Sequence, residues 1–269
     1  MKELGSHRRV LWLCAILLLT GCVVFETARP EPPVQEAVVW DTITPPVRTP
    51  VPTVVPTEQV LGQSGLLWRE CDLSYLGWEQ AETCLGHPLP VRDDTEEGRF
   101  GMRTDRGLVL QDGQDVYEAR SGEFGPLVWS ALYKNGQRLR TTFDGTPFHS
   151  PNISLQLIDG KVAWEFYGER WQTIIYDGQD LRSQYGLYAA YRPYELDSKL
   201  IFIGRKDDKY FIVYDGKQVG SPFDEITIGY CCEIALYAPR FGAGRYVFWG
   251  KRGDGYRLVE IARAGQASQ

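Results

Sequence analysis

A short pattern recurs three times in the second half of the chain and constrains the fold more than any other feature. Each copy places a phenylalanine two residues before a glycine. The three pairs are Phe166 with Gly168, Phe202 with Gly204, and Phe248 with Gly250. Because side chains alternate between the two faces of a strand, each phenylalanine should share a face with its glycine. We predict that the three phenylalanines occupy equivalent buried positions, one per repeat.

Each copy continues into a turn and a returning strand. The turn after Gly204 is charged, and the next strand is rich in β-branched and aromatic residues, as in a β-hairpin. Asp-Gly steps begin at residues 144, 177 and 215, so they are 33 and 38 residues apart. Asp-Gly suits tight turns, and this spacing is typical of stacked or radially arranged sheets. We predict a mainly β fold, a small β-propeller or propeller-like repeated antiparallel sheets, with a short helical N-terminal cap.

The composition agrees with a β-rich fold, and the net charge argues against a nucleic-acid partner. Aromatic residues make up 13% of the 269 residues, and 28 glycines and 16 prolines favour strands and turns over helices. The formal net charge is −6. Because the phosphates of nucleic acids repel an acidic chain, we expect no nucleic-acid partner.

Residues 1–21 have the pattern of a secretory signal. Two arginines precede an apolar run over residues 10–19, which is short for a transmembrane helix. Leu-Thr-Gly-Cys at residues 19–22 follows this run and resembles the lipobox of bacterial lipoproteins. The resemblance implies that the thiol of Cys22 carries diacylglycerol and that Cys22 becomes the new N-terminus. The alternatives are an ordinary signal peptide with an incidental cysteine, or an uncleaved anchor.

The lipobox resemblance also implies a location. Acyl chains on Cys22 would hold the protein on a membrane surface without a membrane span. We therefore expect an extracytoplasmic protein, lipid-anchored to the cell membrane or outer envelope, with the membrane as one partner.

The chain after the signal divides into three segments. Proline recurs between residues 28 and 57 and interrupts helices and strands, so residues 22–57 are predicted to form a disordered, extended tether. Residues 58–107 are predicted to form a helical and loop cap, and residues 108–269 the β-repeat domain.

A short helix is predicted inside the cap segment. Ser74 can cap its N-terminus, and the helix should end at Leu85 because Gly86 and Pro88 follow.

The cysteines leave several disulfide pairings open. Cys14 lies in the signal and Cys22 is assigned to lipid, so four remain: Cys71, Cys84, Cys231 and Cys232. Four cysteines allow three pairings, and an exported protein meets an oxidising compartment. We favour Cys71–Cys84 as a local link, with the adjacent pair free or bonded to each other. In the alternative, each of the adjacent cysteines bonds one of the first pair.

Motifs for catalysis are absent from the sequence. After the signal, the chain has two histidines, His87 and His149, in unrelated contexts, and no nucleophile elbow or zinc-hydrolase motif. No Cys-x-x-Cys spacing supports a metal site. We assign no catalytic residue, cofactor or metal. The alternative is a propeller-type hydrolase such as a glycosidase, which needs two carboxylates; its candidates are Glu165, Asp224, Glu225 and Glu233.

The surplus of tyrosine and tryptophan is the better functional signal. These rings combine an apolar face with a polar tip and can line a groove for a glycan or peptide. Most should be core residues, but Tyr191 and Tyr194 flank Pro193 in an expected turn and are surface candidates. Trp171 and Tyr210 complete the candidate ligand-binding set.

The whole pattern resembles bacterial surface lipoproteins that carry propeller-like repeats. The resemblance implies a non-catalytic binding or assembly role with a cell-envelope glycan or protein partner.

Overall fold

The computed structural model describes most of the chain beyond residue 55. The described ranges are 56–61, 65–73, 77–90, 101–104, 107–124, 127–143, 152–167, 172–229 and 237–264. The chain divides into two compact units, Met1–Pro50 and Val51–Gln269, and all described residues belong to the second. The predicted signal, the lipid site at Cys22 and almost all of the predicted tether lie outside the described residues.

The described residues form a mainly β fold of four antiparallel sheets, as predicted. The first sheet has the order β3 (Met102–Thr104), β4 (Gly107–Asp112), β5 (Asp115–Phe124), β6 (Leu127–Lys134) and β7 (Gln137–Phe143). The second has the order β11 (Gln179–Asp180), β10 (Gln172–Tyr176), β9 (Lys161–Tyr167) and β8 (Asn152–Ile158). The third has the order β12 (Ala189–Leu196), β13 (Lys199–Lys206), β14 (Lys209–Tyr214) and β15 (Lys217–Phe223).

The fourth sheet combines strands from both ends of the described chain. Its order is β1 (Thr57–Leu61), β2 (Leu66–Leu73), β19 (Gly255–Arg263), β18 (Arg245–Arg252) and β16 (Glu225–Ile226), and β17 (Arg240–Gly242) also pairs with β18. Two helices accompany the sheets in these ranges, α2 (Trp78–Leu85) and α3 (Leu181–Tyr185).

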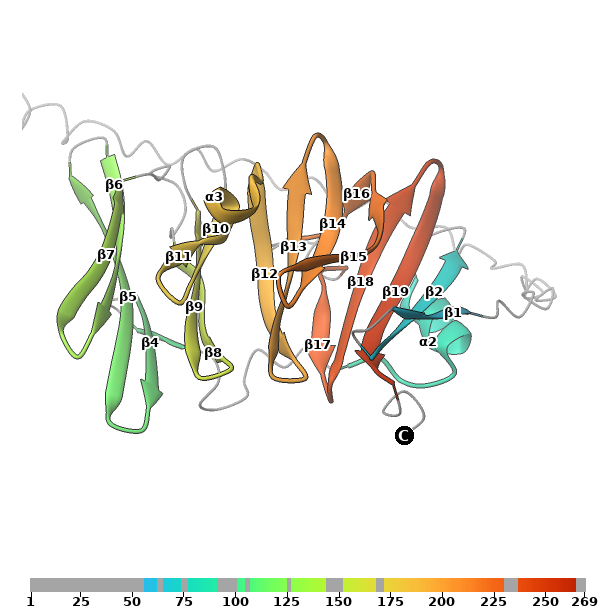
Figure 1. Cartoon of the computed structure of the whole chain (residues 1–269), viewed down its shortest axis with the longest axis horizontal. Helices are drawn as coiled ribbons and strands as arrows, with labels where there is room; N and C mark the ends of the chain where they lie inside the picture. Colours follow the sequence, from blue (N-terminus) through green and yellow to red (C-terminus); the bar gives the residue numbers. More distant parts are fainter. Residues whose placement is uncertain are drawn as a thin grey trace, which may run out of the picture. The chain divides into compact units, whose positions relative to one another are not determined.

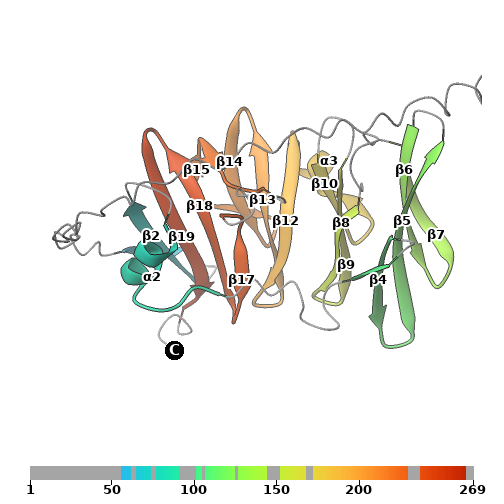
Figure 2. The same ribbon diagram turned by 180° about the vertical axis from the view of Figure 1, so that it is seen from behind.

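Consecutive sheets pack face to face and enclose a separate apolar core at each contact (Figure 1). Leu110 and Trp164 meet between the first and second sheets. Ile174 and Phe202 meet between the second and third. A larger core between the third and fourth sheets contains Ile203 together with many aromatic rings. On the opposite face of the fourth sheet, α2 covers a further cluster (Figure 2). Each inner sheet is therefore buried on both faces.

The predicted burial of the three repeated phenylalanines is confirmed. Phe166, Phe202 and Phe248 are fully buried, and each lies in the core shared with the preceding sheet. The residues that follow two of them, Ile203 and Trp249, lie in the next core along. The same face also holds Gly204, because a side chain there would come within 2.8 Å of the Phe211 ring. Gly250 likewise faces the Phe223 ring, and Gly168 lies outside the described residues.

The structure corrects the alignment of one repeat by two residues. Asp177 and Asp215 both begin positive-φ turns, as predicted. In the third sheet, Phe202 pairs with Val213, which lies two residues before Asp215. In the second sheet, the residue two before Asp177 is Ile175, and its partner is Trp164 rather than Phe166. A shift of two residues keeps the same strand face, so Phe166 is buried as predicted, although its position is not equivalent to that of Phe202.

The cap segment differs from its prediction because its described residues also contain the strands β1, β2 and β3. Strand β2 pairs with β19 over its full length, from Leu66 opposite Arg263 to Leu73 opposite Tyr256. Leu66 packs on one face of the sheet and Cys71 on the other. A strand that is buried on both faces lacks the one-sided alternation that marks a strand in a sequence.

The predicted helix and the favoured disulfide are both present in this segment. Helix α2 ends at Leu85, and Gly86 adopts a φ of 75° as its C-terminal stop. The helix begins at Trp78 with Gly77 as N-cap, instead of beginning after Ser74, which lies outside the described residues. Cys71 bonds Cys84 with an S–S distance of 2.02 Å. Neither helix of the described ranges is long and apolar enough to cross a bilayer.

Candidate functional site

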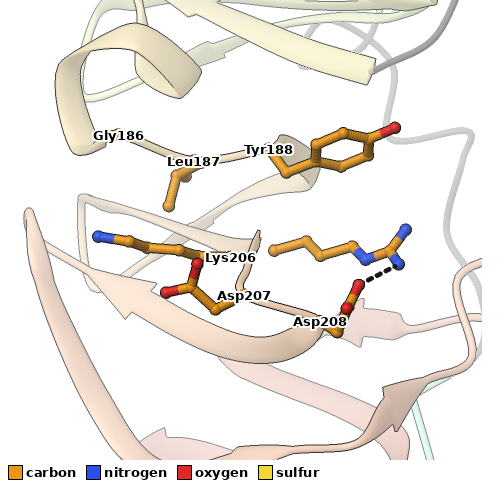
Figure 3. Close-up of a pocket in the computed structure, with 7 residues that line it drawn as sticks. Gly186, Leu187, Tyr188, Lys206, Asp207 and Asp208 are labelled. Carbon is orange, nitrogen blue, oxygen red and sulfur yellow. Dashed lines mark hydrogen bonds and ion pairs between the residues drawn. The ribbon is translucent and has the colours of Figure 1, made fainter.

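A cavity of about 500 Å³ opens between two loops of the second half of the chain (Figure 3). One wall is the connection from α3 to β12, and the opposite wall is the turn between β13 and β14. The lining residues are Gly186, Leu187, Tyr188, Arg205, Lys206, Asp207 and Asp208.

The first wall is fixed by the ends of α3. The side chain of Asp180 accepts a hydrogen bond from the backbone N–H of Arg182 at 3.0 Å and caps the helix start. Gly186 ends the helix with a φ of 61°. The backbone N–H of Tyr188 then donates to the carbonyl of Arg205 at 2.7 Å. This bond attaches the loop to β13 and sets the position of the tyrosine.

The second wall is a two-residue hairpin turn with a left-handed backbone. Asp207 and Asp208 have φ values of 50° and 58°. Consecutive positive φ values define the turn type that joins twisted antiparallel strands tightly, and aspartate tolerates this region better than most residues. The turn holds both aspartates and the neighbouring Arg205 at the rim of the cavity.

An arginine between two tyrosine rings forms the centre of the site. The guanidinium carbon of Arg205 lies 5.3 Å from the ring centre of Tyr188 and 5.4 Å from that of Tyr210. Its Nη2 donates to Asp208 Oδ1 at 3.2 Å. Tyr188 is 55% exposed, more than any other aromatic residue whose burial the structure describes. The cation–π contacts and the ion pair orient the guanidinium before any ligand arrives.

A third tyrosine lies beneath this centre. Tyr191 is buried, and its ring centre is 6.3 Å from that of Tyr210. Burial raises the pKa of Tyr191 to about 12, against the opposing effect of Arg205. Burial also raises the pKa of Tyr210. Both hydroxyls therefore stay protonated at neutral pH, so they act as neutral hydrogen-bonding groups.

The expectation that Tyr191 and Tyr194 lie at the surface is wrong. Both are buried in β12, where Tyr191 pairs with Ile203 and Tyr194 with Ile201. The two residues between them form a bulge, in which Arg192 has a φ of 52°. The bulge places both tyrosines on the face that packs against the fourth sheet. A proline in the sequence indicated a turn, but a bulge accommodates proline within a strand.

Two of the carboxylates proposed for a hydrolase, Glu165 and Asp224, have structural contacts instead of a place in the cavity. Glu165 is buried and accepts hydrogen bonds from the backbone N–H of Arg192 at 2.7 Å and from Gln172 at 2.5 Å. It therefore satisfies the backbone of the bulge. Asp224 pairs with Lys209 and accepts from the N–H of Gly253, and these bonds lower its pKa. Neither Glu165 nor Asp224 lines the cavity.

The remaining candidates divide between exposed and undescribed positions. Glu225 is exposed on β16. Glu233, Trp171, Cys231 and Cys232 lie outside the described residues. Within the described ranges, histidine, cysteine and acidic side chains do not gather in threes as a metal site requires.

Sequence reasoning missed the residues that make the cavity. Of the four ligand-binding candidates, Tyr210 and Tyr191 interact with Arg205 at its centre, Tyr194 lies in the core below, and Trp171 is outside the described residues. Tyr188 follows the glycine that ends a helix, and Arg205 opens a charged turn. Each is an ordinary loop signal alone, and only the fold brings the two loops together.

No family model matches the chain, and no curated protein matches it either.

Proposed function

We propose that this protein is an exported, lipid-anchored, non-catalytic binding module, and that the cavity between Tyr188 and Asp208 holds its ligand, a glycan or a peptide. The observation that carries the proposal is the exposed ring of Tyr188 beside a guanidinium already fixed by Asp208. A side chain oriented in advance loses little conformational entropy on binding, so its contacts contribute more to affinity.

The chemistry of the cavity favours binding over catalysis. Acid–base catalysis requires a group whose pKa is poised near the working pH, or two carboxylates that differ in environment. The side chains here are an arginine, a lysine and two aspartates, of which Asp208 is 94% exposed and paired. An aromatic ring, an apolar side chain such as Leu187 and a few polar groups are the usual parts of a ligand pocket.

We propose further that the four sheets are blades of a propeller-like fold. Supporting this, successive antiparallel sheets pack face to face, and the N-terminal strand β2 adds to the last sheet beside β19. In this way the N-terminal segment of the domain lies beside its C-terminal strand.

Ligand binding should depend on the exposed ring. We expect Tyr188→Ala to weaken affinity by about tenfold or more, because loss of about 1.4 kcal/mol corresponds to that factor. Glycan and peptide arrays identify the ligand, and titration calorimetry measures the affinity.

Tyr133→Ala is the matched control for this experiment. Its ring also carries a stacked arginine, Arg120 at 4.7 Å, but it does not line the cavity. Equal loss in both variants would contradict the assignment of the site. Release of cleaved glycan or peptide by the purified protein would contradict a non-catalytic role.

Lipid attachment should require the cysteine of the lipobox. We expect Cys22→Ala to abolish incorporation of labelled palmitate and to leave unprocessed or soluble protein, because the thiol is the acceptor. Incorporation is measured in cells that express the full chain, with Cys14→Ala as the control. Equal labelling of Cys22→Ala and the parent protein would refute the lipid anchor.

A further inference from the structure

The charges around the cavity balance. Arg205 and Lys206 contribute two positive charges, and Asp207 and Asp208 contribute two negative charges. The four residues are consecutive in the chain, the two cations first and the two aspartates directly after them. The rim therefore offers hydrogen-bond donors and acceptors to a ligand, and the formal charges of these four residues sum to zero.

We infer that the ligand is a neutral saccharide whose ring stacks on Tyr188 and whose hydroxyls bond the Arg205–Asp208 pair. This inference rests on the proposed binding role of the same cavity. An anionic ligand would approach two carboxylates, one of them 94% exposed, and a cationic ligand would approach Arg205 and Lys206. An uncharged ligand is repelled neither by the two carboxylates nor by the two cations.

The aromatic ring supplies the apolar contact that a sugar requires. One face of a pyranose ring presents C–H groups, which pack well on an aromatic face. Tyr188 is exposed by 55%, and the stacked Arg205 keeps its ring in place. Leu187 adds an apolar surface on the same wall (Figure 3).

The ion pair supplies the directional contacts. Arginine only donates hydrogen bonds, and an ionised aspartate only accepts them. Arg205 and Asp208 lie 3.2 Å apart at Nη2 and Oδ1, so they present a donor and an acceptor side by side. Neighbouring hydroxyls of a sugar can accept from the first and donate to the second. This match needs no net charge on the ligand.

Matched saccharides test the inference directly. Tetrasaccharides of glucose, galactose and mannose are titrated into the full chain beside the corresponding uronate tetrasaccharides, by calorimetry at low and moderate salt. We expect at least one neutral saccharide to bind at least tenfold more tightly than its uronate. The affinity of this neutral saccharide should change less than twofold between low and moderate salt, because salt weakens only interactions between charged groups.

Substitutions at Tyr188 and Asp208 separate ring stacking from the contribution of the carboxylate. Tyr188→Phe keeps the ring and should retain affinity within about threefold, whereas Tyr188→Ala should lose at least tenfold. Asp208→Asn keeps the size of the side chain but removes the carboxylate, and should reduce neutral-saccharide affinity several-fold. Tyr133→Ala should have no effect.

Each other outcome overturns a specific statement. Tighter binding of a uronate, or binding of array peptides alone, with dependence on Tyr188, would refute a neutral saccharide and leave the proposed binding role intact. Equal losses for Tyr188→Phe and Tyr188→Ala would refute ring stacking. Binding of neither saccharides nor peptides would overturn both the ligand class and the proposed function.

Discussion

Replacing Phe202 by alanine is expected to lower the free energy of unfolding by about 3–5 kcal/mol. The ring is fully buried between the second and third sheets, so its loss removes apolar contacts and leaves a cavity. A domain of ordinary stability has about 5–15 kcal/mol in total, so a change of this size brings it close to unfolding. Urea denaturation followed by tryptophan fluorescence measures the difference.

The equivalent substitutions should behave alike. Phe166 and Phe248 are as fully buried, each against the preceding sheet, so alanine at either should cost a similar amount. Leu139→Ala is the control, because that side chain is 54% exposed and should change stability by less than about 0.5 kcal/mol. A cost below about 1 kcal/mol at any of the three phenylalanines would contradict the repeated core.

Removing the disulfide is expected to destabilise the fold by about 3 kcal/mol. Cys71 and Cys84 are 13 residues apart, and a bond that closes a loop of this length restricts the unfolded chain by about that amount. The double variant Cys71→Ala with Cys84→Ala also loses two buried side chains beside Trp249. Thermal unfolding of the parent and the variant measures the effect.

A reductant provides the control for the disulfide. Reduction should lower the stability of the parent protein by a similar amount, while the double variant should not respond. A parent protein that is insensitive to reductant would contradict the contribution of the bond. A double variant that still responds would reveal a second disulfide elsewhere in the chain.

The sequence predicted the local features well. Alternation around Phe202 and Gly204 placed both on one face, and the structure confirms the burial. Gly86 marked the end of α2 because a left-handed residue stops a helix. The disulfide followed from proximity in sequence. Each feature depends on residues that are close together in the chain.

The bulge of β12 shows where local reasoning failed. Pro193 indicated an exposed turn, yet the chain remains a strand because distant side chains satisfy its backbone. Glu165 accepts from the N–H of Arg192, and Gln156 donates to the carbonyl of Pro193 at 2.7 Å. Both partners come from the second sheet, so no pattern near residue 193 encodes them.

Thus the sequence by itself determined the β character, the turn chemistry, the repeated buried aromatic and the helix end, since strand alternation and backbone preferences act over a few residues. Tertiary structure alone decided that β2 completes the last sheet, that Tyr191 is buried, and that Tyr188 meets Arg205. These outcomes require pairing between segments far apart in the chain. Their free energy comes from burial and hydrogen bonds that exist only after the sheets have packed.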